Sequence, residues 1–193
     1  MLINDNLILD SNLDNPTYWQ SKNDYKKDGP VVTAIFNGPQ SLGLIFETTE
    51  NIKADTDYTL SIYVKGTKAF KLNYIYLMYG EDGNLSLRSD RELHEPNIWY
   101  RVSIPIKHSK DNNFKNVMVA STNLSDESME LSFKYPKLEM GTEATQYIPN
   151  KNSLDPSKQA IFKAGGGIPR GVSTLVSKVV DFDQLRLGVG YVS

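Results

Sequence analysis

The side chains best suited to recognition chemistry in this sequence are aromatic. The chain contains eleven tyrosines and two tryptophans, more than a hydrophobic core alone requires. A tyrosine ring stacks on the C–H face of a sugar while its hydroxyl group forms a hydrogen bond. Aromatic residues and three polar neighbours could line one β-sheet for this purpose: Tyr63, Asn73, Tyr74, Tyr76, Tyr79, Arg88, Trp99 and Arg101. Alternatively, half of them belong to the core or to a protein interface, because tyrosine is common in strands.

Oxygen-bearing side chains lie close together near the N-terminus. Asp10, Asn12 and Asp14 have the alternate spacing with which a calcium-binding loop begins. The pattern departs from an EF-hand at Asn15, where glycine is expected, and at Ser21, where glutamate is expected. A turn in which these side chains cap their own backbone explains the same residues. The sequence allows a structural calcium but favours the ordinary turn.

No catalytic motif is evident. His94 and His108 lack the close spacing of a helix-borne metal pair. The sequence also lacks a Gly-x-Ser-x-Gly elbow and a Walker phosphate loop. The two carboxylates that hydrolyse a glycosidic bond are brought together by the fold and need not be close in sequence. The carboxylates that come nearest to a cluster in this sequence lie in expected turns, where solvated charge is the ordinary explanation: Glu81, Asp82, Asp90, Glu92 and Glu95. We expect a protein that is not an enzyme.

Composition excludes several classes of protein. The hydrophobic content of 39% and charged content of 23% are typical of a soluble globular chain. A net charge of -2 without a basic stripe argues against nucleic-acid binding. The absence of cysteine removes disulfides and thiolate metal sites. Because we find no signal peptide and no long apolar run, we expect neither export nor a membrane span.

Short strands must position these side chains. In residues 58–66, positions 58, 60, 62 and 64 are apolar, whereas 59, 61 and 65 are polar. This alternation predicts a strand with one buried face and with Tyr63 on the open face. Similar runs predict strands at 7–9, 31–36, 42–46, 70–79, 85–87, 98–106, 116–122 and 129–135.

Several details of these elements can also be predicted. Residues 20–30 are polar and loop-like, and Pro105 indicates an edge or a bulge. Residues 70–79 are apolar on both faces beyond Leu72 and should form a central strand. Two strand faces are expected to be buried: Tyr100, Val102, Ile104 and Ile106 in one strand, and Met129, Leu131, Phe133 and Tyr135 in another.

Nine or ten short strands, with no convincing helix before residue 150, predict an all-β antiparallel sandwich. Alternation alone cannot choose between a jelly roll and an immunoglobulin-like topology.

The character of the sequence changes after Pro149. Asp155-Pro156 is a helix-start signal, and residues 157–164 could form a two-turn helix that ends at Gly165-Gly166-Gly167. Later apolar residues fit either a helix or a strand. This part is richer in apolar side chains than it can bury alone and therefore requires a partner surface. We expect two parts, residues 1–150 and 151–193.

Residues 134–150, with the sequence Lys-Tyr-Pro-Lys-Leu-Glu-Met-Gly-Thr-Glu-Ala-Thr-Gln-Tyr-Ile-Pro-Asn, form a strand end, a Met-Gly turn and an apolar clasp. This segment resembles the closing signature of carbohydrate-binding-module-like jelly rolls in bacteriophage tail and baseplate proteins. The opening up to Trp19, the strand at 58–66 and the run from Trp99 to Ser103 resemble other parts of the same family, in the same order. The resemblance implies a jelly roll with Trp19 packed under the sandwich. It also implies that a structural calcium would lie near the sandwich edge.

The resemblance further implies a non-enzymatic phage virion protein, synthesised in the bacterial cytoplasm. Residues 1–150 would adhere to host cell-wall carbohydrate, with weak binding raised by many copies. Residues 151–193 would attach the domain to other phage structural proteins, and we expect a homo-oligomer. One alternative is a purely structural spacer or decoration of the tail, baseplate or capsid that binds no sugar. An accessory domain of a wall-degrading enzyme is disfavoured, because the sequence shows no catalytic domain.

Overall fold

The computed structural model describes residues 4–72, 74–79, 83–88, 92–109, 114–123 and 127–150. Within them, the side chains at positions 40–42, 79, 83, 84, 88, 122 and 123 are left undescribed. The predicted C-terminal part, 151–193, and its expected helix lie outside the described residues. No helix in the described ranges is long and apolar enough to cross a membrane.

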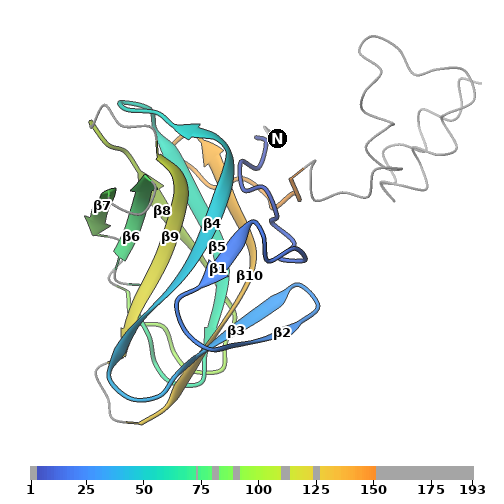
Figure 1. The fold of residues 1–193 in the computed structure, drawn as a ribbon, viewed down its shortest axis with the longest axis vertical. Coiled ribbons are helices and arrows are strands. Elements are labelled where there is room, and N and C mark those ends of the chain that lie inside the picture. The colour runs from blue at the N-terminus through green and yellow to red at the C-terminus, as the bar shows by residue number, and fades with distance from the viewer. Residues whose placement is uncertain are drawn as a thin grey trace, which may run out of the picture. The chain divides into compact units, whose positions relative to one another are not determined.

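Ten strands in the described part of the chain form two five-stranded sheets (Figure 1). The first sheet has the order β1 (Trp19–Ser21), β4 (Gln40–Ile52), β9 (Phe114–Asn123), β6 (Tyr74–Tyr79) and β7 (Gly83–Arg88). The second sheet has the order β2 (Tyr25–Asp28), β3 (Val31–Phe36), β10 (Met129–Met140), β5 (Tyr58–Gly66) and β8 (Tyr100–Ile106). Neighbouring strands are antiparallel throughout. The predicted all-β sandwich is confirmed.

One apolar core fills the space between the sheets. Each strand turns alternate side chains inward, so apolar residues from both sheets meet and exclude water. Trp19 is 2% exposed, which places it in the core as expected. The largest fully buried apolar side chains of the described residues are Tyr58, Phe36, Phe46, Phe114, Phe133, Ile8, Leu13, Leu44, Ile52 and Leu60.

Several strand predictions hold in detail. β5 has the predicted bounds, and Tyr63 lies on its outer face. Val102, Ile104 and Ile106 of β8 are buried, whereas Tyr100 is half-buried. Pro105 is exposed on β8, an edge strand that has no need of its missing N–H donor. The predicted central strand begins only at Tyr74, but β6 does lie between β9 and β7.

Two predicted segments differ from the structure. Residues 20–30 are not one loop, because they contain the end of β1 and all of β2. β2 is an exposed edge strand, so its polar sequence carries no apolar alternation. Residues 7–9 form only an isolated bridge between Ile8 and Thr48. The Leu7 amide donates to Leu138 of β10 while its carbonyl accepts from Thr49 of β4, so this segment joins both sheets instead of extending one.

Tyr135 does not share the buried face predicted for it. The pairing of β10 with β5 shifts register between Lys134 and Lys137, and Tyr135 has a φ of 53°. A β-bulge resets the alternation of side chains. The Tyr135 ring instead contacts the outer-face ring of Tyr63, with 6.3 Å between centroids, and that of Tyr147, at 4.8 Å.

Candidate functional site

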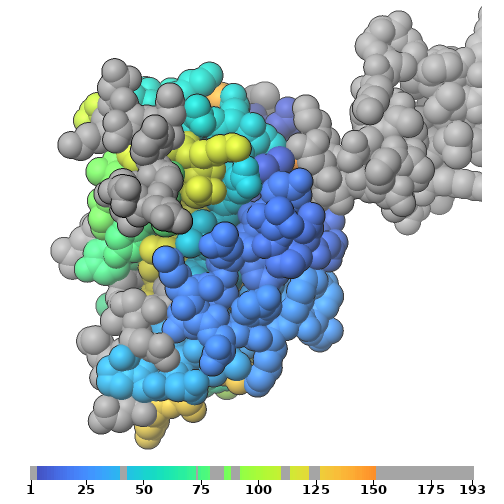
Figure 2. All heavy atoms as spheres, in the orientation of Figure 1, coloured from blue at the N-terminus to red at the C-terminus, as the bar shows by residue number. Residues whose placement is uncertain are grey.

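A groove of about 640 Å³ crosses the outer face of the first sheet. Figure 2 shows this face, with the blue segment around β1 beside the cyan strand β4 and the yellow strand β9. The groove is lined by Thr17, Tyr18, Trp19, Gln20, Lys22, Ile45, Glu47, Met78, Lys115 and Asn116.

Strand register brings these residues together. Across the sheet, Gln20 is opposite Ile45 and Ile45 is opposite Met118. In the next outward-facing row, Glu47 is opposite Asn116 and Asn116 is opposite Met78. The residues between them in each strand point into the core, so the polar and sulfur-containing side chains share the outer face.

An ion pair lies in the groove. Lys115 Nζ is 2.8 Å from Glu47 Oε1, with the two side chains 57% and 29% exposed. The hydrogen bond to Glu47 raises the pKa of Lys115, which favours its charged ammonium form. The carboxylate and the ammonium group keep free acceptor and donor positions, which suit the hydroxyl groups of a sugar.

Two tyrosines extend this face along β6. Tyr76 is two residues from Met78 and opposite Met118. Tyr74 is one further outward position along the strand and 37% exposed. Their ring centroids are 5.9 Å apart at an interplanar angle of 37°. Tyr18, also 37% exposed, lines the groove beside β1, so the outer face of the first sheet carries aromatic rings in the groove and farther along β6.

The predicted binding residues are divided between the two sheets. Tyr74 and Tyr76 lie on the same outer face as the groove, farther along β6 than the groove-lining Met78, and Arg88 is opposite Tyr74 in the register. Asn73 and the side chains of Tyr79 and Arg88 lie outside the described residues. Three of the predicted residues belong with the second sheet instead: Tyr63, Trp99 and Arg101. The expectation that all would line one sheet is wrong, because alternation assigns faces within a strand but does not assign strands to sheets.

Sequence reasoning missed most of the groove. Tyr18 precedes β1, Gln20 lies within it and Lys22 follows it, whereas the polar sequence from residue 20 predicts a loop. Glu47 and Lys115 directly flank the predicted strands 42–46 and 116–122, and their charge is a signal of an exposed position.

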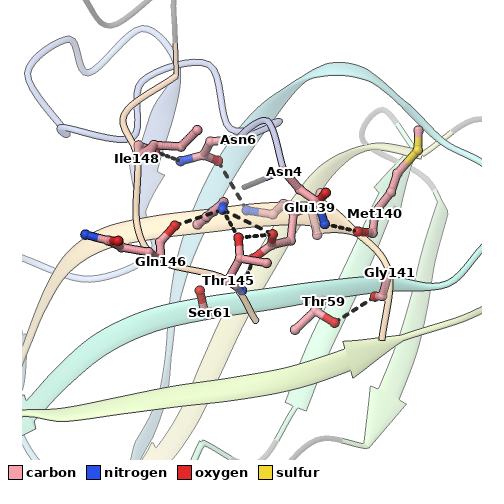
Figure 3. Close-up of polar contacts among 12 residues, drawn as sticks. Asn4, Asn6, Thr59, Ser61, Glu139, Met140, Gly141, Thr145, Gln146 and Ile148 are labelled. Carbon is pink, nitrogen blue, oxygen red and sulfur yellow. Dashed lines mark hydrogen bonds and ion pairs between the residues drawn. The ribbon is translucent and has the colours of Figure 1, made fainter. Parts of the chain in front are cut away.

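The motif at residues 134–150 forms a closing clasp. Lys137 and Glu139 are completely buried and 3.1 Å apart. Lys137 Nζ donates to the Gln146 carbonyl at 2.9 Å, and Glu139 accepts the Thr145 amide at 2.9 Å and its hydroxyl at 2.6 Å (Figure 3). Burial lowers the pKa of Lys137, and the nearby Glu139 carboxylate opposes that shift.

We call residues 141–150 the closing segment. Asn6 donates to the carbonyls of Pro136 at 3.0 Å and Ile148 at 3.1 Å, so it ties the start of the chain to β10 and to the closing segment. Thr59 donates to the Gly141 carbonyl at 2.8 Å, and Ser61 receives a hydrogen bond from Arg101. These contacts explain why Thr59 and Ser61 are only 1% and 2% exposed, although alternation predicts an open face.

Tyr147 anchors the closing segment to the N-terminal turn. Its hydroxyl group lies 3.1 Å from the Ser11 carbonyl and 3.0 Å from Asn12 Oδ1. Burial raises the pKa of Tyr147 to about 12. Tyr147, in the predicted apolar clasp, therefore holds the closing segment in place through hydrogen bonds of its hydroxyl group.

The residues of the predicted calcium loop have partners within the protein. Asp10 Oδ2 accepts the Asn15 amide at 2.5 Å, and Asp14 pairs with Lys27 at 3.5 Å. Burial also raises the pKa of Asp10. No group of three or more His, Cys, Asp or Glu side chains able to hold a metal occurs among the described residues. These contacts favour the backbone-capping turn, and calcium binding stays a prediction.

The histidines pack in or beside the core. His94 is 6% exposed, and its ring centroid lies 4.6 Å from that of Tyr100. His108 Nε2 is 3.2 Å from the Ile52 carbonyl. Glu92 and Glu95 are exposed, whereas Glu81, Asp82 and Asp90 lie outside the described residues.

No protein-family model matches the sequence, and no curated protein sequence does. Solved structures do resemble it. A CBM4 module matches with a TM-score of 0.51 and 12% identity, over 66% of this chain and 98% of that chain. The tripod BppUct-A-L from the baseplate of bacteriophage Tuc2009 matches with a TM-score of 0.57 and 17% identity, over 79% of this chain and 60% of that chain. A mutant of a family 29 carbohydrate-binding module matches with a TM-score of 0.50 and 9% identity, over 74% and 95% of the two chains.

This chain has the jelly-roll fold of carbohydrate-binding modules. The same fold occurs in the phage baseplate protein, so the jelly roll suggested by the sequence motifs is confirmed. At these low identities the likeness concerns the fold.

Proposed function

We propose that this jelly roll is a non-enzymatic carbohydrate-binding domain of a phage virion protein, which adheres to a host cell-wall polysaccharide through the groove on the first sheet. The observation that carries the proposal is the 37% exposed Tyr18 ring in that groove, with the Tyr74–Tyr76 pair farther along the same outer face, beyond the groove-lining Met78. Its setting in a carbohydrate-binding-module fold adds support.

The groove and the rest of this outer face offer both kinds of contact that a sugar requires. The partly exposed ring of Tyr18 in the groove, and those of Tyr74 and Tyr76 farther along β6, are suited to stacking on the C–H face of a pyranose. Glu47 and Lys115 provide charged acceptors and donors for hydroxyl groups, with Gln20 and Asn116 beside them. An open groove of this kind holds a chain of sugars weakly, and many copies on one particle would raise the overall avidity.

We assign attachment to residues 151–193. Their apolar sequence, following the closing segment, suits docking to other phage structural proteins, and the likeness to a baseplate tripod favours a virion location and a homo-oligomer. Deleting residues 151–193 should leave sugar binding intact and abolish incorporation into particles, measured by immunoblotting of purified virions. Incorporation of the truncated chain at the level of the full chain would contradict this assignment.

A structural role without sugar binding is the second candidate. The likeness to the Tuc2009 baseplate protein favours it as much as it favours attachment. A glycan array and a pull-down with purified wall polysaccharide separate the two functions. We expect retention on at least one glycan, reduced by soluble oligosaccharide. A blank array and pull-down, with the protein still present in purified particles, would support the structural role and overturn adhesion.

A further inference from the structure

A cluster of aromatic and cationic side chains lies on the outer face of the second sheet, on the other layer of the sandwich from the groove. We call Tyr63, Lys65, Trp99 and Lys134 the cationic cluster. Lys134 is opposite Tyr63 in the pairing of β10 with β5, and Trp99 directly precedes β8, the next strand. The pairing of β10, β5 and β8 therefore places these side chains next to one another on the outer face.

Two lysines share one indole ring. Lys134 Nζ lies 4.2 Å from the centroid of the Trp99 ring, and Lys65 Nζ lies 5.2 Å from it. Lys134 Nζ is also 5.9 Å from the Tyr63 ring and 5.6 Å from the Tyr135 ring. The aromatic faces stabilise these ammonium groups and hold them in place.

The charge of the cluster is not neutralised by the described part of the chain. No ion pair joins Lys65 or Lys134 to a carboxylate among the described residues. The nearby acids are engaged elsewhere: Glu130 pairs with Lys26, and Glu139 pairs with Lys137. Because both ammonium groups lie over one ring, they are no farther apart than about 10 Å, which is about one Debye length at 0.1 M salt. An anion between them would interact with both.

A third cation borders the same face. Arg101 is opposite Tyr63 on β8, and its guanidinium donates to Ser61 Oγ at 3.1 Å and to the Thr145 carbonyl. Tyr63 thus has Lys134 on one side and Arg101 on the other. Arg101 fixes the closing segment, and its positive charge adds to the field over the cluster.

We propose that the cationic cluster is a second binding site, specific for an acidic saccharide that carries a carboxylate or a phosphate group. The anion would lie between Lys65 and Lys134 while a sugar ring contacts the half-buried edges of Tyr63 and Trp99. The four side chains match one or two sugar units in size. A stable protein interface requires about 800 Å² from each partner, so a saccharide fits this small cluster better than a protein does. The site does not depend on sugar binding in the groove.

Trp99 provides a direct reporter. Trp19 is 2% exposed, whereas Trp99 is half-buried and has both lysine ammonium groups within 5.2 Å of its ring centroid. Tryptophan fluorescence can therefore be followed in the full chain at about 20 mM salt. The probes are trigalacturonate for carboxylate, glucose 6-phosphate for phosphate and maltotriose as the neutral control. We expect a saturable change with at least one acidic probe and none with maltotriose, and the responding probe identifies the anion.

The lysines are tested by charge removal. Lys65→Gln combined with Lys134→Gln should weaken binding of the acidic probe by about tenfold. Lys107→Gln removes one positive charge from an exposed residue that pairs with Asp57, and it should leave affinity unchanged. Raising the salt to about 0.5 M should weaken binding by the unaltered chain.

Three outcomes would overturn the second site: no saturable response to either acidic probe, equal response to maltotriose, or unchanged affinity in the double variant. The first outcome would leave an acidic protein surface as the alternative partner. Tyr18→Ala, which alters the groove and leaves the cationic cluster intact, should retain full affinity for the acidic probe. If a variant loses polysaccharide binding in the groove but still binds the acidic probe at the cationic cluster, the two sites are independent. Failure of one site can thus be distinguished from failure of the other.

Discussion

At the scale of single residues, the closing motif is explained by a buried ion pair. Burying Lys137 and Glu139 removes both charges from water, which is costly unless the pair is also hydrogen-bonded. Thr145 supplies that compensation, because its hydroxyl lies 2.5 Å from Lys137 Nζ and 2.6 Å from Glu139 Oε2. The Lys-Leu-Glu and Ala-Thr parts of the motif are therefore two halves of one hydrogen-bonded unit.

Thr145→Val should destabilise the fold by about 1–3 kcal/mol, because it leaves a buried ammonium and a buried carboxylate each short of one partner. Urea denaturation measures the change. Thr142→Val is the matched control, since Thr142 lies in the same segment but is exposed, and it should change the free energy of unfolding by less than about 0.5 kcal/mol. Equal effects of the two substitutions would contradict the role of Thr145.

Tyr147 should make stability fall at high pH. Its folded-state pKa of about 12 exceeds the ordinary 10.0, so the folded chain keeps a proton that the unfolded chain releases between these values. The stabilisation is complete below pH 10 and decreases as the pH rises towards 12, by at most about 2–3 kcal/mol.

Tyr147→Phe removes this titration while keeping the ring. The stability advantage of the unaltered chain over the variant should therefore shrink between pH 9 and pH 11.5, as measured by urea denaturation at each pH. A constant difference over that range would show that the hydroxyl group does not titrate as the structure implies.

At the scale of elements, alternation predicted strands well where one face is buried and the other is open. β8 satisfies that condition along its length, whereas the outer face of β5 is open only at Tyr63 and Lys65. The prediction failed at Tyr135, because the bulge in β10 changes the face without any change in composition. It also failed at β2, whose four residues are all exposed and which pairs with β3 through backbone hydrogen bonds.

Gly66, at the end of β5, should tolerate no side chain. A Cβ atom there would lie 2.6 Å from the Lys68 carbonyl oxygen and 2.6 Å from Phe70 Cδ1. Gly66→Ala should therefore destabilise the fold by about 1–3 kcal/mol in urea denaturation.

Gly43→Ala provides the comparison for Gly66→Ala. Its Cβ would meet Met118 Sδ at 2.5 Å, but the methionine side chain is flexible and half-exposed and can move aside. The cost should stay below about 1 kcal/mol. A larger loss of stability at Gly43 than at Gly66 would contradict the packing described for the end of β5.

At the scale of the whole molecule, the chain presents two chemically different outer faces. The first sheet carries the groove, and the second carries the cationic cluster beside the closing segment. The sequence could indicate that Tyr63 lies on an open face, but not that Tyr76 does, because residues 70–79 are apolar on both faces beyond Leu72. It could not indicate which face each belongs to, because sheet membership depends on long-range pairings such as that of β6 with β9.

The groove was also beyond prediction for a physical reason. It arises where Gln20, Glu47 and Lys115 meet from three strands that are distant in sequence, and each residue alone looks like an ordinary surface residue. Only their convergence, on the outer face that also carries Tyr74 and Tyr76, makes this surface the candidate site.

The central claim is that sugar binds in the groove on the first sheet. Its most direct measurement is the affinity of the full chain for purified wall polysaccharide by affinity electrophoresis, comparing Tyr18→Ala with Leu93→Ala. Tyr18 lines the groove and is 37% exposed, whereas Leu93 is a 55% exposed apolar residue that does not line the groove and serves as the control. Loss of one stacking ring should weaken binding by about tenfold in Tyr18→Ala and leave Leu93→Ala unchanged. Equal retention of the two variants, or retention lost equally in both, would contradict binding through the groove.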